Sequence, residues 1–327
     1  MTIPFTLAAV SDATHIVLLH PRSAEFAAAI GAAAPDAPLH AFDDPAAAAA
    51  CLAGTGAEVL VTVAFPAEIA AEAHRLRWVQ TVSAGVDPLL PHRAALRHCV
   101  VTNARGMHAE QMADYALAAM FMLRWDFKRV LRDQAARHWR RKPKAPLAGC
   151  TLGVVGLGAI GREIARRARS AGMVVIGISR GGAAVQELDE VHPYGRLRDL
   201  LPRCDFLVLA VPATPETVAL LDDAALRRMK PGACLLNLAR GSVVDEPALI
   251  AALREGRLGG AALDVFATEP LPADNPLWAM ENVIVTPHIA GMTEDYAARF
   301  AADFAANLTR YRRGEALRNT VKLERGY

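Results

Sequence analysis

The chain has 327 residues, of which 53% are hydrophobic and 21% are charged, and its formal net charge is +2. This length favours two domains over one, and the composition argues against long disordered stretches. A charge this close to zero gives no reason to expect nucleic acid or a membrane surface as a partner.

The cysteines and the first residues of the chain indicate in which cellular compartment the protein is found. The five cysteines are Cys51, Cys99, Cys150, Cys204 and Cys234. They form no C-x-x-C pair, so neither a disulfide framework nor a metal site is expected, and we interpret each as a small buried apolar residue in a reducing compartment. Residues 1–10 lack the basic residues that open a secretory signal, and no apolar run is long enough to span a bilayer. The sequence therefore predicts a soluble, cytoplasmic protein.

In the first part of the chain, short apolar strands alternate with Ala-rich helices, the pattern of a parallel sheet with helices on both faces. Strands are predicted at residues 15–19, 58–63, 78–81 and 99–102. Helices are predicted at residues 24–33, 45–53 and 66–73. Residues 110–138 contain neither Pro nor Gly and have apolar residues at helical spacing, which predicts one long helix.

A glycine-rich turn, G-L-G-A-I-G at residues 156–161, follows a predicted strand at residues 151–155 and opens a predicted helix. In such a turn Gly156 makes the tight bend, Gly158 lets the backbone approach a pyrophosphate, and Gly161 lets helix and strand pack closely. The helix N-terminus adds free N–H groups that attract an anion. The candidate cofactor-binding residues here are Gly156, Gly158, Ala159, Ile160 and Gly161.

After this turn the sequence predicts five more strands, at residues 174–178, 206–210, 234–237, 261–263 and 283–285. With residues 151–155 they make six strands, the number that a doubly wound dinucleotide-binding sheet requires. Further helices are predicted at residues 222–229 and 246–255.

The tail at residues 294–311 is predicted to be helical, and no strand follows it. We expect this helix to pack on the first part of the chain, which leaves the cofactor domain inserted inside the other domain. The predicted substrate domain comprises residues 1–103 plus 289–327, and the predicted NAD(P)-binding domain comprises residues 104–288.

Three reactive side chains follow predicted strands, where open α/β sheets build their sites. Arg240 has a glycine behind it, Glu269 is followed by a proline, and His288 lies between Pro287 and a small-residue turn. A guanidinium can hold a carboxylate through two parallel hydrogen bonds, and an imidazole beside a carboxylate can deliver a proton. These residue types suit the reduction of a 2-keto acid by hydride transfer. Taken singly, Arg240 could be a surface ion-pair partner, Glu269 an exposed loop acid and His288 a capping residue.

The runs LLNLARGSVVDE (residues 235–246), LDVFATEP (263–270) and TPH (286–288) resemble the D-isomer-specific 2-hydroxyacid dehydrogenases. The resemblance covers nearly the whole chain. It implies that Arg240 binds and polarises the substrate, that His288 is the acid/base and that Glu269 is its partner.

The resemblance also implies further site residues. Pro212 and Asp264 join the cofactor-binding residues, with Asp264 at the nicotinamide end. The turn at Ala84, Gly85 and Val86 resembles the loop whose backbone N–H groups hold the substrate carboxylate. A plain strand-to-helix turn is the alternative interpretation of these three residues.

The family's fold is a doubly wound parallel sheet (Rossmann) cofactor domain inserted in a smaller flavodoxin-like α/β substrate domain. Residues 106–112, the His138-Trp139 pair and the closing residues 325–327 resemble the glyoxylate/hydroxypyruvate reductase A branch. Family members are commonly dimers joined through the cofactor domain and its leading helix. The resemblance therefore implies a homodimer in which Trp125 or Phe127 lies at the interface.

The choice of nicotinamide cofactor depends on the end of the second strand of the cofactor domain. NAD enzymes usually carry an acid there to hold the ribose 2′-hydroxyl, whereas this chain has Ser179 followed by Arg180. The missing acid removes a repulsion that a 2′-phosphate would meet, and the arginine offers it charge-assisted hydrogen bonds. We predict that NADP(H) is preferred and that NAD(H) remains possible; a solvated loop arginine is the alternative.

The sequence thus predicts a cytoplasmic, NADPH-dependent reductase of small 2-keto acids, glyoxylate or hydroxypyruvate, that forms D-2-hydroxy acids. One alternative is a 3-phosphoglycerate dehydrogenase-like enzyme, and another is a non-catalytic NAD(H)-sensing scaffold like the corepressors of similar sequence. Formate dehydrogenase fits poorly because that family has an amide where this chain has Glu269. The S-specific lactate and malate dehydrogenases carry their glycine turn near the N-terminus.

Overall fold

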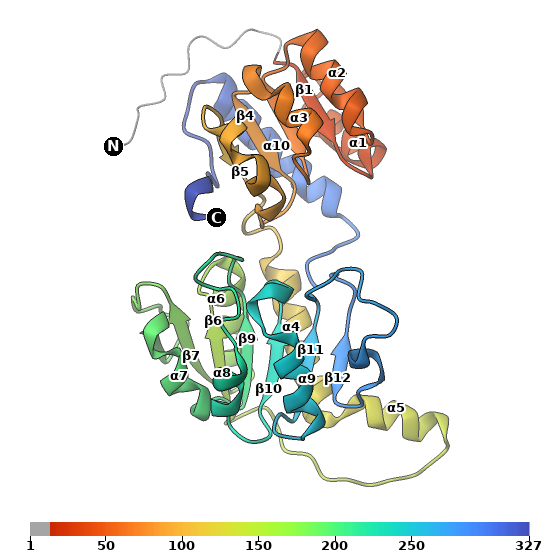
Figure 1. Cartoon of the computed structure of the whole chain (residues 1–327), viewed down its shortest axis with the longest axis vertical. Coiled ribbons are helices and arrows are strands. Elements are labelled where there is room, and N and C mark those ends of the chain that lie inside the picture. Colours follow the sequence, from red (N-terminus) through yellow and green to blue (C-terminus); the bar gives the residue numbers. More distant parts are fainter. Residues whose placement is uncertain (1–13, 327) are drawn as a thin grey trace. The chain divides into compact units, whose positions relative to one another are not determined.

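A computed structural model gives the structure of residues 14–326, which form two compact units (Figure 1). Unit 1 comprises the residues up to Met107 together with those from Thr293 onward, and unit 2 is the continuous segment His108–Met292. Residues 1–10, on which the expectation about a secretory signal rests, lie outside the described range, as does Tyr327. No helix within residues 14–326 combines the length and the apolar character needed to cross a membrane.

Unit 1 is built on a five-stranded parallel sheet. Its strands are β1 (Ile16–Leu19), β2 (Leu39–Phe42), β3 (Val59–Thr62), β4 (Trp78–Thr81) and β5 (Val100–Thr102). Their order, β2-β1-β3-β4-β5, is that of the flavodoxin-like sheet. Strand β2 was not predicted from the sequence, because it is an edge strand whose four residues are only half-buried and whose apolar run is broken by His40.

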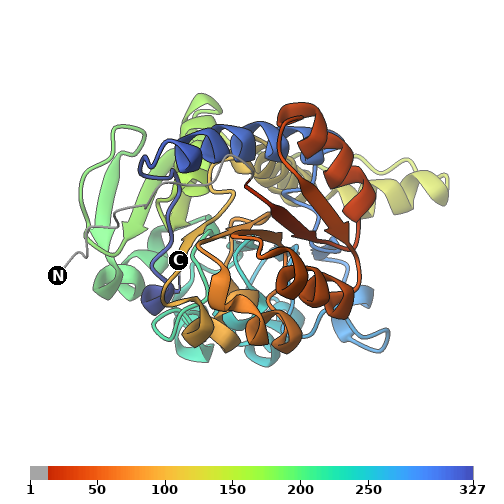
Figure 2. The same cartoon turned by 90° about the horizontal axis from the view of Figure 1, so that it is seen from above.

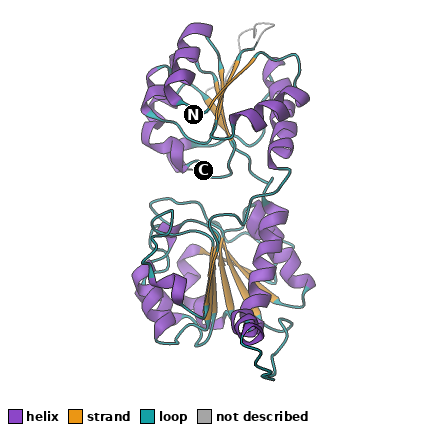
Figure 3. Cartoon of the chain, turned by 90° about the vertical axis from the view of Figure 1, so that its right-hand side faces the viewer, coloured by secondary structure: helices purple, strands orange, loops and turns teal. Residues whose placement is uncertain are grey.

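Helices cover both faces of this sheet (Figure 3). The alternation of side chains along β1 separates the two cores. Ile16 and Leu18 pack under α1 (Ser23–Ala33) and α10 (Tyr296–Arg312), whereas Val17 and Leu19 pack under α2 (Pro45–Thr55) and α3 (Ala67–Ala71). Short 3₁₀ helices lie at Ala73–Arg75, Asp87–Leu96 and Leu323–Arg325.

The C-terminal helix α10 packs against α1, as Figure 2 shows with α10 in blue and α1 in red. Trp78 of β4 stacks on Phe304 and Tyr311, with ring centroids 5.1 and 5.5 Å apart. These aromatic side chains are almost completely buried. The expectation that the helical tail packs on the first part of the chain is therefore confirmed.

Unit 2 is built on a seven-stranded parallel sheet. Its strands are β6 (Thr151–Val155), β7 (Val174–Ser179), β8 (Glu190–Pro193), β9 (Phe206–Leu209), β10 (Cys234–Asn237), β11 (Gly260–Leu263) and β12 (Val283–Val285). The order β12-β11-β10-β9-β6-β7-β8 is that of a doubly wound Rossmann sheet with one additional strand at the β12 edge. The prediction of six strands is wrong, because β8 is a polar edge strand that ends in proline and has no apolar run to reveal it.

The helices of unit 2 also cover both faces of its sheet. They are α4 (Ala109–Trp125), α5 (Phe127–Ala135), α6 (Ala159–Ser170), α7 (Leu197–Leu200), α8 (Asp223–Arg228) and α9 (Glu246–Arg254). Short 3₁₀ helices lie at Tyr194–Arg196, Leu201–Arg203, Gly241–Val243 and Pro276–Ala279. Helices α4 and α6 share one core with the sheet, and α7, α8 and α9 share the other.

The single long helix predicted over residues 110–138 is wrong, because the chain breaks at Asp126 and becomes irregular after α5. Asp126 adopts a left-handed conformation with φ 56°, which aspartate tolerates better than most residues. Its carboxylate accepts hydrogen bonds from Arg129 Nε at 2.8 Å and from Lys144 Nζ at 3.5 Å. Those partners hold the break, and they could not be inferred from helical periodicity.

Candidate active site

The glycine turn after β6 has the geometry of a dinucleotide cradle. Gly156 has φ 99°, and a Cβ there would lie 2.4 Å from the carbonyl oxygen of Ala210. A Cβ on Gly161 would lie 1.9 Å from the carbonyl oxygen of Gly156, so close packing of helix and turn excludes any side chain. Gly158 caps α6, and a Cβ there would meet no atom within 4 Å. Two of the glycines are thus required by packing, whereas Gly158 leaves open space beside the first N–H groups of the helix, where a phosphate fits.

The strand that should meet the adenosine ribose ends in Ser179 and is followed by Arg180. Ser179 Oγ accepts a hydrogen bond from the N–H of Gly182 at 3.2 Å, which shapes the loop after β7. The pKa of Glu216 is lowered mainly by a hydrogen bond from Thr214 and also by the charge of Arg180. The guanidinium of Arg180 therefore lies near the loop after β9, in which the carbonyl oxygen of Pro212 accepts a hydrogen bond from Thr217.

His288 and Glu269 form a direct pair at the carboxyl edge of the sheet of unit 2. His288 Nδ1 lies 2.8 Å from Glu269 Oε2. Glu269 Oε1 accepts a hydrogen bond from the N–H of Phe266 at 3.0 Å, so both carboxylate oxygens are held. The two side chains keep 49% and 36% of their surface exposed. With Nδ1 on the carboxylate, Nε2 remains the ring atom that can exchange a proton with a reactant.

Arg240 lies in the turn after β10, next to the segment that carries Glu269. The carbonyl oxygen of Arg240 accepts a hydrogen bond from Asn237 Nδ2 at 3.0 Å, and its Nη1 donates to the carbonyl of Ala239 at 2.7 Å. A Cβ on the following Gly241 would lie 1.9 Å from the carbonyl carbon of Phe266. This close approach brings the arginine turn against the 266–269 loop. The strands β10, β11 and β12 are neighbours in the sheet (Figure 1), so their three following turns share one edge.

Asp264 anchors the turn that carries His288. Its Oδ1 accepts from the N–H of Ile289 at 2.9 Å, its Oδ2 from the N–H of Ala290 at 3.0 Å, and its backbone carbonyl from the N–H of His288 at 2.9 Å. Asp264 is 2% exposed. These bonds explain why residues 289–292 belong to unit 2, although the predicted domain boundary lies at residue 288.

The turn at Ala84, Gly85 and Val86 belongs to unit 1 and follows β4. The carbonyl of Ala84 accepts from Asn103 Nδ2 and that of Gly85 from Ser83 Oγ, both at 2.7 Å. Within residues 14–326, the N–H groups of these three residues donate to no other residue. Two carbonyl groups of the turn are thus bonded within unit 1, and the N–H groups of its three residues are the donors that it could offer to an anion.

Within residues 14–326, no group of three or more His, Cys, Asp and Glu side chains could hold a metal ion.

All five cysteines are free. Cys150 and Cys204 are buried, but Cys51, Cys99 and Cys234 are half-buried, so the prediction of five buried cysteines is wrong for three. Burial raises the pKa of Cys204 to about 11 and that of Cys234 to about 12, which keeps both as thiols.

Known proteins resemble this chain over most of its length. The family model of the D-isomer specific 2-hydroxyacid dehydrogenase NAD binding domain matches residues 117–290. The glyoxylate reductase of Korarchaeum cryptofilum is 38% identical over 274 residues, which cover 81% of this chain and 82% of that protein. The D-3-phosphoglycerate dehydrogenase of Mycobacterium leprae is 35% identical over 262 residues, which cover 80% of this chain and 49% of that protein.

A solved structure extends the similarity. The NADPH-dependent glyoxylate/hydroxypyruvate reductase of Sinorhizobium meliloti, in complex with NADP and sulfate, matches with a TM-score of 0.87 at 25% identity, over 96% of this chain and 100% of that chain. The chain belongs to the D-isomer-specific 2-hydroxyacid dehydrogenase family. It is an NAD(P)-dependent oxidoreductase with a Rossmann domain in unit 2, and its family acts on small 2-hydroxy and 2-keto acids.

Sequence reasoning missed the anchoring bonds of Asp264 and the side chains of Ser83 and Asn103 that shape the turn after β4. Asp264 was assigned to the nicotinamide alone, because a resemblance transfers a role but not the hydrogen bonds behind it. Asn103 lies nineteen positions from its acceptor in the chain, so no local pattern reveals the contact.

Replacing Gly158 with alanine should weaken cofactor binding without unfolding the chain. The added methyl group meets no protein atom, but it enters the space beside the helix N-terminus. We expect the Kd for NADPH to rise about tenfold or more, measured by fluorescence titration, with an unchanged Tm. Gly31→Ala, in an equally open position on α1, serves as the matched control. An unchanged Kd for Gly158→Ala would contradict the assignment of this turn.

Proposed function

We propose that the enzyme reduces glyoxylate or hydroxypyruvate with NADPH and forms the D-2-hydroxy acid. The observation that carries this proposal is the 2.8 Å pair of His288 and Glu269 beside the turn of Arg240, on the same sheet as the glycine turn. The similarity to glyoxylate reductases supports the substrate class. In this proposal unit 1 is the substrate domain and unit 2 is the cofactor domain.

The roles of the residues follow from their chemistry. The guanidinium of Arg240 binds the substrate carboxylate and polarises the keto oxygen, and the N–H groups of Ala84, Gly85 and Val86 are the further candidates for holding the carboxylate. A reduced nicotinamide bound at the glycine turn would supply the hydride for the keto carbon. His288 gives its Nε2 proton to the oxygen, which becomes the hydroxyl of the product. Glu269 holds the imidazole by Nδ1 and stabilises its protonated form.

The cofactor would be held by the turn at Gly156, Gly158 and Gly161 with Ala159 and Ile160, and by Pro212 and Asp264 further along the sheet. Selection of NADPH over NADH is assigned to Ser179 and Arg180. No acidic residue ends β7, and Arg180 supplies a cation at that strand end. The complex of the Sinorhizobium meliloti enzyme with NADP supports the same preference.

A 3-phosphoglycerate dehydrogenase-like activity is the second candidate, because the Mycobacterium leprae relative is 35% identical. This chain spans about half of that relative's length. A screen of 2-keto acids that includes 3-phosphohydroxypyruvate, with either cofactor, decides between the two substrates.

We also propose a homodimer formed through α4, α5 and the segment that follows them. Several large apolar side chains there are exposed: Phe121, Trp125, Phe127, Val130, Leu131 and Trp139. Trp139 is 94% exposed, and water-exposed aromatic side chains in such a patch indicate an interface with another protein. A second copy of this chain is the occupant that the family resemblance favours.

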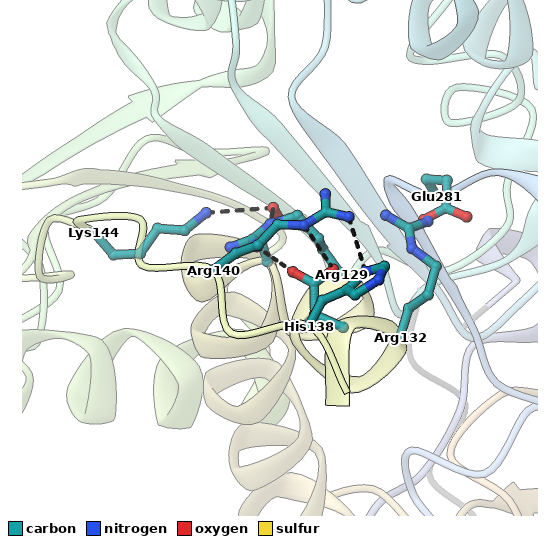
Figure 4. A network of polar contacts seen from close by, with 8 residues as sticks. Arg129, Arg132, His138, Arg140, Lys144 and Glu281 are labelled. Carbon is teal, nitrogen blue, oxygen red and sulfur yellow. Dashed lines mark hydrogen bonds and ion pairs between the residues drawn. The ribbon is translucent and has the colours of Figure 1, made fainter. Parts of the chain in front are cut away.

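Ion pairs give this exposed segment a fixed shape, as Figure 4 shows. Arg129 binds Asp126 and Asp133, each at 2.8 Å. Lys144 reaches Asp126 at 3.5 Å, and Arg140 reaches Asp133 at 3.6 Å. The helix α5 and the irregular segment after it are thus joined before any second copy binds, which lowers the entropy cost of forming the dimer.

We also propose a cytoplasmic location, which the free thiols of all five cysteines support.

Replacing His288 with alanine tests the reaction. Because the imidazole supplies the proton, kcat for glyoxylate and hydroxypyruvate should fall by ~10²–10⁴, while NADPH binds as before. Consumption of NADPH at 340 nm gives kcat, and fluorescence titration gives the Kd. Wild-type turnover in His288→Ala would refute the mechanism, and no reduction of either acid by the wild type would refute the proposed substrates.

Replacing Arg180 with alanine tests the cofactor preference. The variant loses the cation assigned to the 2′-phosphate, so kcat/KM for NADPH should fall about tenfold or more, while that for NADH changes little. Arg162→Ala, on α6 of the same unit, controls for the loss of one positive charge. Equal kcat/KM values for the two cofactors, in both the wild type and Arg180→Ala, would contradict the preference.

Replacing Leu131 with glutamate tests the dimer. Leu131 is 54% exposed, so the new carboxylate costs the isolated chain little, whereas it would be buried without a partner in the dimer. Sedimentation velocity should show the wild type as a dimer and the variant as a monomer. Val174→Glu, at another exposed apolar position of unit 2, should remain dimeric. A monomeric wild type would exclude the proposal.

A further inference from the structure

We propose that Tyr115 and Thr286 are positioning residues for His288, and that they act through Asp264. The inference rests on the proposed role of His288 as the proton donor. Tyr115 Oη lies 2.7 Å from Thr286 Oγ1, and Thr286 Oγ1 lies 2.7 Å from Asp264 Oδ1. The three side chains form one hydrogen-bonded chain from α4, through the segment after β12, to the segment after β11.

The direction of the hydrogen bonds in this chain is fixed. A carboxylate only accepts hydrogen bonds, so the hydroxyl of Thr286 must donate to Asp264. Its oxygen is then the acceptor for the phenol of Tyr115. Burial, together with the charge of Asp264, raises the pKa of Tyr115 to about 12, although the hydrogen bond to Thr286 opposes the shift. The phenol therefore stays protonated and remains a donor near neutral pH.

The two hydroxyl-bearing residues of this hydrogen-bonded chain, Thr286 and Tyr115, are each held on a fixed element. The N–H of Thr286 donates to the carbonyl of Leu263 at 3.0 Å, which continues the ladder between β11 and β12. Helix α4 packs on the sheet through Ala113, Ala116 and Met120, which are buried. Fixed elements therefore present the hydroxyl of Thr286 to Asp264 and the hydroxyl of Tyr115 to Thr286.

Asp264 needs these donors because it is buried and holds a strained turn. Two of its three carboxylate bonds go to the N–H groups of Ile289 and Ala290, and the third comes from Thr286. His288 has φ 54°, a left-handed conformation that is strained for a residue with a side chain and persists only where surrounding bonds hold it. If the third donor is removed, the carboxylate can turn away from the N–H groups, and the imidazole loses its orientation toward the reactant.

The test compares matched variants in the full-length enzyme. Thr286→Val removes the hydroxyl at constant shape, and Thr286→Ser restores it without the methyl group. Tyr115→Phe removes the far end of the chain. The control is Tyr311→Phe in unit 1, which also removes a phenol that donates to a carboxylate, here Glu58 Oε2 at 2.9 Å.

We expect kcat to fall about 10- to 100-fold in Thr286→Val and about 3- to 10-fold in Tyr115→Phe, with KM for the keto acid and Kd for NADPH nearly unchanged. Thr286→Ser should keep a kcat close to that of the wild type. The double variant should be no slower than Thr286→Val, because both substitutions break the same chain. Tyr311→Phe should change stability only.

Two results would overturn the inference. One is a kcat in Tyr115→Phe and Thr286→Val that matches Tyr311→Phe at equal Tm. The other is a loss in Thr286→Ser as large as in Thr286→Val, which would assign the effect to packing of the methyl group. If the wild type reduces none of the 2-keto acids offered, the proposed function fails on its own, and amide hydrogen exchange still tests the positioning. Faster exchange at Ile289 and Ala290 in Thr286→Val and Tyr115→Phe, but not in Tyr311→Phe, supports it, and unchanged exchange excludes it.

Discussion

The arrangement of the site depends on one buried carboxylate, that of Asp264. Burying a charge is costly unless hydrogen bonds replace its water, and the carboxylate of Asp264 obtains three of them from the segment after β12. Its N–H donates to the carbonyl of Asn237, so the segments after β10, β11 and β12 are tied together at one residue. The positions of Arg240, Glu269 and His288 follow from that connection.

Stability alone does not account for the pair of His288 and Glu269. Both side chains are more than a third exposed, and an exposed ion pair contributes about 0–1 kcal/mol. The left-handed backbone at His288 costs of order 1–3 kcal/mol, so the pair and its turn together add little or nothing to the free energy of folding. What the strained turn provides is a fixed imidazole with one nitrogen on a carboxylate, an arrangement that suits the proposed proton transfer to a substrate.

Much of the fold could be predicted because the central strands are fully buried apolar runs. The bounds of β4, β6 and β10 agree with the predicted residues, since every residue or nearly every residue of these strands is buried. The edge strand β12 also has the predicted bounds, because its three residues are all apolar. The edge strands β2 and β8 could not be found in the same way, because half-buried strands carry polar residues and lack that signal. The helix break at Asp126 was also missed. It is held by ion pairs with Arg129 and Lys144, and the spacing of apolar residues carries no information about ion pairs. The types and positions of Arg240, Glu269 and His288 were enough to predict them as site residues. The hydrogen bonds that hold them join residues far apart in the chain, so they could not be predicted.

Close backbone approach at glycine builds both the cofactor turn and the arginine turn. At Gly161 the helix α6 meets the carbonyl of Gly156, and at Gly241 the chain after Arg240 meets the carbonyl carbon of Phe266, each at 1.9 Å from an ideal Cβ. A side chain at either position would separate elements that the site requires to be adjacent. Gly158 differs, because nothing in the protein fills the space of its missing side chain. The contrast separates a glycine that the fold requires from one that leaves room for a ligand, and the second kind marks the place that we propose for the pyrophosphate.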